Sequence, residues 1–97
     1  FDVIVDIRKD SKTFGKYETF LLSEGTDEII FIPKGMAHGF QTLENNTDLL
    51  YFMDGIYNKE FESGVIWNDD ELKIPWPVKN KIISEKDKNL NLLKDLV

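Results

Sequence analysis

The chemistry-bearing residues of this chain begin with its only histidine, His38, which lies between Gly35 and Gly39. Glycines remove side-chain cover and allow close approach, so we expect an imidazole that stands open rather than packed. Two tyrosines follow, Tyr51 and Tyr57. Imidazoles and phenols both bind substrates and carry protons, and the three residues together suggest a pocket. Taken singly, each is more often an ordinary core or surface residue.

A hairpin would bring the histidine and the first tyrosine together. Residues 37–53 read as two strands closed around 45–46, an Asn-Asn pair that is plausible in a type I′ turn. In that register His38 faces Met53, and Tyr51 lies diagonal to His38 on the same face, roughly 7 to 8 Å away. The inference holds for any loop of even length, because a one-residue slip turns a strand over.

Composition excludes several other kinds of site. With one histidine and no cysteine, the chain lacks the ligands for a two-histidine-one-carboxylate or thiolate metal site, and we expect no metal or other cofactor. Phosphate-binding loops and Ser/His/Asp spacings are absent. A net charge of -6 and a single arginine, Arg8, leave no basic stripe for nucleic acid.

The whole-chain numbers indicate an ordinary soluble domain. The chain is 41% hydrophobic and 31% charged, and no apolar run approaches the roughly 20 residues of a membrane span. We therefore expect no membrane association, and the lack of cysteine fits a cytoplasmic location. A length of 97 residues predicts a single domain over 1–97.

Short strands are the elements that must position these residues. Phe1, Val3, Val5 and Ile7 alternate with polar residues, which is typical of a half-buried strand. Similar runs recur with turn residues between them, which predicts an all-β antiparallel sandwich or barrel. The predicted strands are 1–7, 17–22, 28–32, 37–43, 49–53 and 64–67.

The C-terminal third differs in pattern. Pro75 and Pro77 cannot continue a central strand, so we expect an irregular surface excursion over 68–83. Ser84 followed by Asp87 resembles a capping box and predicts a short C-terminal helix. Apolar residues then recur at helical spacing, at Leu90, Leu93 and Val97.

Six motifs, taken together and in order, resemble the C-terminal half of the dTDP-4-dehydrorhamnose 3,5-epimerase family. They span nearly the whole chain and lie at 5–8, 11–16, 32–40, 67–69, 74–77 and 83–87. The resemblance implies a cupin-like jelly roll, here incomplete at its N-terminus. It also implies a homodimer, in which a neighbouring subunit helps to complete the substrate pocket.

The resemblance implies a reaction as well. The substrate would be a nucleotide-linked 4-keto-6-deoxy sugar whose carbon 3, carbon 5 or both are inverted through an enolate. Tyr51 matches the family's acid, and a phenol suits this role because it stays protonated at neutral pH. Asp87 matches the aspartate that orients the catalytic histidine. The matching substrate-binding positions are His38, Tyr57, Glu62 and Lys86.

The family's base is not among these residues. Its Arg-Gly-x-His motif and a further active-site lysine both precede the strand in which this chain begins. We therefore expect a fragment, and we expect the 97 residues alone to be close to inactive, because acid–base groups contribute roughly 10²- to 10⁴-fold each. Two alternatives stay open: a 3,4-ketoisomerase relative, and a non-catalytic sugar-nucleotide-binding module.

Overall fold

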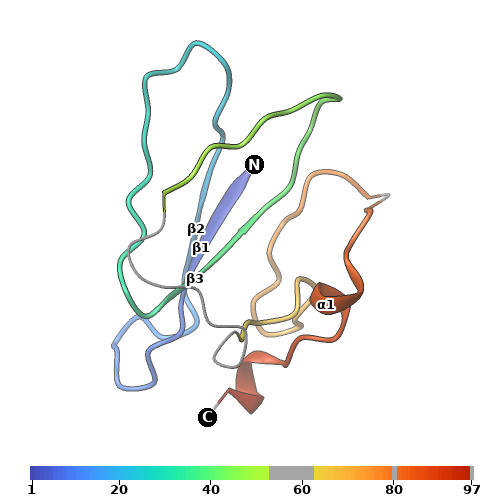
Figure 1. Ribbon diagram of the computed structural model, residues 1–97. Helices are drawn as coiled ribbons and strands as arrows, with labels where there is room; N and C mark the ends of the chain where they lie inside the picture. Colours follow the sequence, from blue (N-terminus) through green and yellow to red (C-terminus); the bar gives the residue numbers. More distant parts are fainter. Residues whose placement is uncertain (53–62, 80, 97) are drawn as a thin grey trace.

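The regular structure is a three-stranded antiparallel sheet with one short helix (Figure 1). The computed structural model describes residues 1–52, 63–79 and 81–96. The strands are β1 (Asp2–Asp6), β2 (Tyr17–Phe20) and β3 (Met36–Phe40), in the order β2-β1-β3. This confirms three of the predicted strands in shortened form. None of the described helices has the length and apolar character of a membrane-spanning segment.

Strand β1 is the centre of the sheet and of the core. Val3 and Val5 point to one face, where they form the buried cluster with Leu72 and Leu93. Partly buried side chains pack around this cluster, at Ile7, Phe14, Tyr17, Ala37, Val65, Ile74, Trp76 and Leu96. The C-terminal residues thus cover one face of the sheet.

The polar residues of β1 are buried too, which corrects the expectation of a half-buried strand. Asp2 and Asp6 are only 5% and 4% exposed. Both carboxylates accept hydrogen bonds from other segments, and a buried charge is tolerated when it is bonded in this way. Only Ile4, between them, is intermediate in burial.

The predicted hairpin over 37–53 is wrong for the residues that the structure describes. The partner of β3 is β1, and His38 lies opposite Ile4. Residues 49–52 form no strand, and at the turn only Asn46 has a positive φ, whereas a type I′ turn needs two. No described strand lies beside 49–52, so its N–H and C=O groups have no ladder to join.

Two further strand predictions are also wrong. Residues 28–32 lie in the connection between β2 and β3, where the side chains of Ile29 and Phe31 are 96% and 83% exposed. Residues 64–67 contribute only an isolated parallel bridge, from Val65 to Asn91. Both segments lack a neighbouring strand among the described residues, and strand propensity alone does not make a sheet.

The predicted C-terminal helix is present but short. Helix α1 (Glu85–Lys88) begins after Ser84, whose hydroxyl accepts from the Asp87 N–H, as the capping pattern predicted. It ends at once, because the Asn89 side chain bonds the Glu85 carbonyl and the following residues form the bridge at 91. A separate 3₁₀ turn, η2 (Leu93–Asp95), follows.

The described residues of 68–83 form no helix or strand, as predicted. They are not merely a surface excursion, however. Leu72 belongs to the buried cluster, and Asp69 is 3% exposed. Trp76 packs against Gly39 of β3 and donates its indole N–H to the Trp67 carbonyl at 2.8 Å. The segment therefore joins the sheet to the C-terminal residues.

Candidate active site

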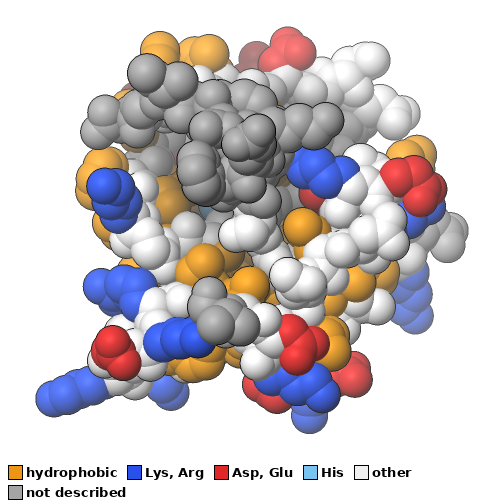
Figure 2. Space-filling view, turned by 60° about the horizontal axis from the view of Figure 1, so that its bottom comes forward, with side chains coloured by type: hydrophobic (Ala, Val, Ile, Leu, Met, Phe, Trp, Pro, Cys, Tyr) orange, Lys and Arg blue, Asp and Glu red, His pale blue; other side chains and the backbone are white. Residues whose placement is uncertain are grey.

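A hollow of about 1060 Å³ runs along the edge of the sheet and is lined by all five residues of β3. It extends over β1, where Val3, Val5 and Ile7 line it, and its other walls come from residues within 41–45, 63–67, 72–78 and 81–90. Hydrophobic side chains lie exposed between basic and acidic ones on the face shown in Figure 2. Mixed walls of this kind suit a ligand with both apolar and polar parts.

Three residues predicted from the sequence line this hollow: His38, Lys86 and Asp87. His38 comes from β3, whereas Lys86 and Asp87 come from α1, almost fifty positions later. All three residues line the hollow, but the β1–β3 register places the His38 side chain on the face of Ile4 and Asp2, whereas the C-terminal residues cover the opposite face, that of Val3 and Val5. Among the residues that the structure describes, no cluster of three or more His, Asp or Glu side chains could hold a metal ion.

His38 is not an isolated open imidazole. Its Nε2 lies 2.5 Å from Oδ1 of Asp2, and the side chains are 31% and 7% exposed respectively. A carboxylate accepts, so Nε2 carries the proton and Nδ1 is the nitrogen left to contact a ligand. Asp2 is a site residue that the sequence reasoning missed. Its place on the same face of the sheet, two strand positions from the residue opposite His38, could have been found only with the β1–β3 register.

Asp87 and Lys86 lie on a single turn of helix. The Asp87 backbone N–H donates to Ser84 Oγ at 3.2 Å, which fixes the start of α1. Both side chains are exposed. One turn is too short to hold its own position in water, so other contacts of this segment must set where the carboxylate lies.

The structure does not bring Tyr51 to the hollow. Tyr51 is 67% exposed and is not among the lining residues, and the hairpin expected to place it beside His38 is not formed. Tyr57 and Glu62 lie outside the described residues. Of the described candidate residues, His38, Lys86 and Asp87 therefore line the hollow and Tyr51 does not.

Asp69 ties the C-terminal segment to the core. Its carboxylate accepts the backbone N–H groups of Glu71 (2.8 Å), Leu72 (3.1 Å) and Leu93 (2.7 Å). Burial acts to raise the pKa of Asp69, but the three N–H donors and nearby Lys94 outweigh it and hold the pKa below its usual value. The ionised form is thus part of the fold.

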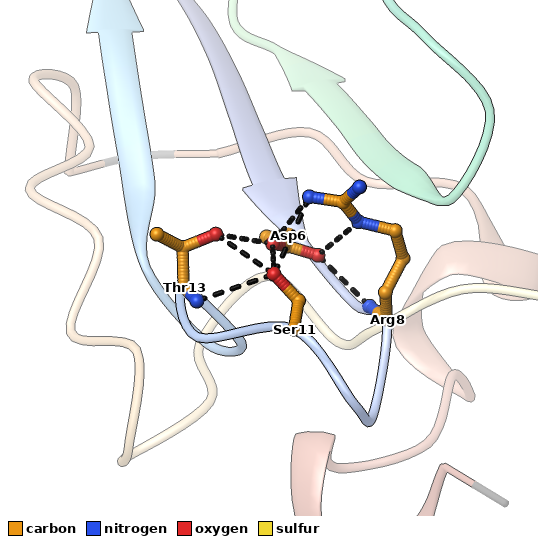
Figure 3. Close-up of polar contacts among 4 residues, drawn as sticks. All are labelled: Asp6, Arg8, Ser11 and Thr13. Carbon is orange, nitrogen blue, oxygen red and sulfur yellow. Dashed lines mark hydrogen bonds and ion pairs between the residues drawn. The ribbon is translucent and has the colours of Figure 1, made fainter.

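Asp6 organises the turn after β1 (Figure 3). Its carboxylate accepts from the Arg8 guanidinium and from the hydroxyls of Ser11 and Thr13. The Arg8 side chain, followed by those hydroxyls, holds the pKa of Asp6 far below its usual range. The Arg8 stem also fills the space beside Gly35, where a Cβ would lie 2.6 Å from Arg8 Cγ. Asp6 and Arg8 thereby fix the turn that leads into β3 and His38.

The lining of the hollow thus includes a histidine, a lysine and an aspartate that the sequence had singled out. Comparison with known proteins identifies the family. The family model for dTDP-4-dehydrorhamnose 3,5-epimerase matches residues 1–95. The chain is 44% identical to the Shigella flexneri enzyme of that name, over 92% of this chain and 49% of the relative. It is 41% identical to the Escherichia coli enzyme, over 100% and 53%.

Solved structures agree. An epimerase from Bacillus anthracis with TDP and PPi bound shares 42% identity over 95% of this chain and 53% of its own, with a TM-score of 0.81. One from Legionella pneumophila in complex with dTDP-4-keto-L-rhamnose shares 32% identity over 100% and 52%, with a TM-score of 0.79. This chain belongs to the dTDP-4-dehydrorhamnose 3,5-epimerase family. It spans about half the length of the curated relatives that it matches.

Proposed function

We propose that this chain supplies one half of the active site of an epimerase that inverts carbon 3, carbon 5 or both of a dTDP-4-keto-6-deoxy sugar. The family match over residues 1–95 carries the proposal, and the presence of His38, Lys86 and Asp87 in the lining of one hollow supports it. The relatives are named as 3,5-epimerases, which favours this reaction over the 3,4-ketoisomerase. The pathway served would be the biosynthesis of dTDP-rhamnose.

Each side chain has a chemical role in this proposal. The substrate ketone acidifies the neighbouring carbons, and His38, held by Asp2, hydrogen-bonds the sugar near the developing enolate charge. Lys86 attracts the pyrophosphate. Tyr51 protonates the enolate on the opposite face, and Asp87 orients the base. Tyr57 stacks on the nucleotide base, and Glu62 contacts the substrate.

The base must come from outside these 97 residues. The family's Arg-Gly-x-His motif, which supplies the base, does not occur in the chain, and its single histidine matches a substrate-binding position of the family instead. We infer that residues 1–97 form one domain only as part of a larger cupin-like jelly roll, incomplete as it stands. Large apolar side chains that are more than 80% exposed support this, at Ile29, Phe31, Leu50, Phe52 and Ile82.

The exposed apolar side chains also predict that the chain forms a homodimer. Exposed apolar side chains and a sheet edge at β3 favour a homodimer, in which a partner covers part of this surface. The chain together with its natural upstream residues should sediment as a dimer, whereas a monomer at all concentrations would remove this part of the proposal.

The deciding experiment follows hydrogen exchange into the substrate. The chain with its natural upstream residues is incubated with dTDP-4-keto-6-deoxyglucose in heavy water, and the sugar protons are followed by NMR. Deuterium entry at carbons 3 and 5 supports double inversion, and entry at carbon 3 alone supports a single-centre enzyme. Tyr51→Phe removes the proton donor but keeps the ring, so inversion at carbon 5 should be lost. The 97-residue chain alone should give no exchange above background.

A non-catalytic binding module is the second candidate, and the absence of the family's Arg-Gly-x-His motif from these residues favours it. It predicts saturable dTDP binding without exchange. Lys86→Ala should weaken dTDP binding about tenfold, because an ion pair to phosphate is lost. Lys88→Ala is the matched control, since Lys88 does not line the hollow and bonds Glu85. Deuterium exchange into the substrate would exclude the non-catalytic binding module. A failure to bind dTDP at all would exclude both the epimerase and the binding module.

A further inference from the structure

The segment 81–93, which contains Asp87, contacts the motif 67–69 at both of its ends. The proposed function gives this Trp-Asn-Asp motif no task. At the first end, Lys81 Nζ lies 4.9 Å from the centroid of the Trp67 ring, a cation–π contact. Figure 1 draws the two segments close together on one side of the sheet. This contact holds the N-terminal end of the segment, whose middle forms only one helical turn.

At the second end, Asp69 makes the firmer contact. Its Oδ2 accepts the Leu93 N–H at 2.7 Å, across 24 positions of sequence, and the bond is buried. Oδ1 accepts from Glu71 and Leu72 within its own loop. One carboxylate therefore joins the loop that contains it to the residue where the C-terminal segment enters the core. Loss of the Oδ2 acceptor would leave a buried N–H of Leu93 unpaired.

Two neighbouring contacts make the path of the segment specific. The Ile66 N–H donates to the Asn91 carbonyl at 2.8 Å, next to the bridge from Val65. A Cβ on Gly64 would lie 3.2 Å from Leu90 Cδ1, so the two chains approach closely there. Residues 90–93 are thus held against 64–69. Asp87 lies three residues before this contact, on a turn that ends at position 88.

We propose that Asp69 is a positioning residue for Asp87. By holding Leu93, Asp69 fixes the C-terminal end of 81–93 and with it the orientation of α1 at the wall of the hollow. The inference rests on the proposed function for the role of Asp87, and it adds a residue that lies outside the lining of the hollow. Asp69→Asn tests it, because the amide keeps the shape and the Oδ1 acceptor but turns an NH₂ group toward the Leu93 N–H. Asp70→Asn is the control: it makes the same change of charge at the adjacent, exposed position.

The first test is amide hydrogen exchange in the chain together with its natural upstream residues, read by peptide mass spectrometry. Asp69→Asn should raise exchange about tenfold or more in 84–93, while β1 changes by less than about twofold, because one tether is lost rather than the core. Asp70→Asn should leave both regions unchanged. Equal exchange of 84–93 in the two variants would overturn the proposal. Uniform acceleration, or loss of the folded circular dichroism signal, would also overturn it, because Asp69 would then act only on overall stability.

The second test is a double-mutant cycle in the active epimerase, made with the upstream residues that the proposed function requires. Asp69→Asn should lower kcat about 10- to 100-fold through misorientation of Asp87. In an Asp87→Asn background it should change kcat less than about twofold, since the group that it positions is already gone. Effects that multiply would refute action through Asp87. Failure of the unsubstituted enzyme to exchange substrate protons would refute the proposed function and so the role of Asp87, whereas the amide exchange test separately decides whether Asp69 anchors the segment.

Discussion

Replacing Leu93 with alanine tests how firmly the C-terminal segment belongs to the core. Leu93 is 3% exposed and packs in the buried cluster with Val3, Val5 and Leu72. Its neighbour Leu92 is 38% exposed. The same substitution at both positions therefore compares a core leucine with a surface leucine in one segment.

The structure sets the expected magnitude. A buried Leu→Ala change costs about 2 to 5 kcal/mol, and the larger values occur where the surroundings cannot collapse into the cavity. The methyl group of Leu93 lies 3.3 Å from the Cβ position of Gly15, against a backbone held by turn hydrogen bonds, so we expect about 3 kcal/mol. Leu92→Ala should cost about 1 kcal/mol or less. For a domain of this length, about 3 kcal/mol corresponds to a fall in Tm of roughly 12 to 24 °C.

Urea unfolding followed by far-ultraviolet circular dichroism measures both variants. The urea midpoint of Leu93→Ala should fall at an unchanged slope, because the native fold is retained and only its free energy of unfolding changes. If the two variants differ by less than about 0.5 kcal/mol, which is the usual spread of surface substitutions, the C-terminal segment is not part of the core and the packing argument is refuted.

Two further results are expected. Asp6 and Asp69 have lowered pKa values in the folded chain, so the unfolded chain takes up protons first as the pH falls. The urea midpoint should therefore hold from about pH 7 to 5 and decline below that, and the decline should be less steep in Asp69→Asn. An unchanged midpoint down to about pH 3 would contradict the role of both carboxylates. Gly35→Ala should lower the urea midpoint more than Gly25→Ala. Both glycines have a positive φ, but only at Gly35 would the new Cβ meet the Arg8 side chain. Equal falls in the urea midpoint would mean that the Arg8 side chain moves freely aside.

Local rules predicted the elements that depend on near neighbours. Alternation located β1, and strand-like runs bounded by turn residues located β2 and β3, because both signals depend only on residues close in sequence. Ser84 predicted the start of α1, since a capping hydroxyl acts on an N–H only three residues away. The motifs identified the family, and of the site residues that the resemblance implies, His38, Lys86 and Asp87 line one hollow.

Strand pairing and the partners of buried charges were decided by the tertiary structure. The sequence favoured a hairpin between 37–43 and 49–53 because those runs are close together, yet β3 pairs with β1 across thirty or more residues. Asp2 looked like the solvent side of an alternating strand, and nothing near it in sequence indicates that His38 lies 2.5 Å away. Asp69 likewise meets Leu93 only in the fold. The alternating pattern of a strand marks its faces but not its neighbour, and a carboxylate that bonds across 24 or 36 positions leaves no local signal. The sequence by itself therefore determined local elements and the family motifs, and only the fold revealed Asp2 and Asp69, because their partners are distant in sequence.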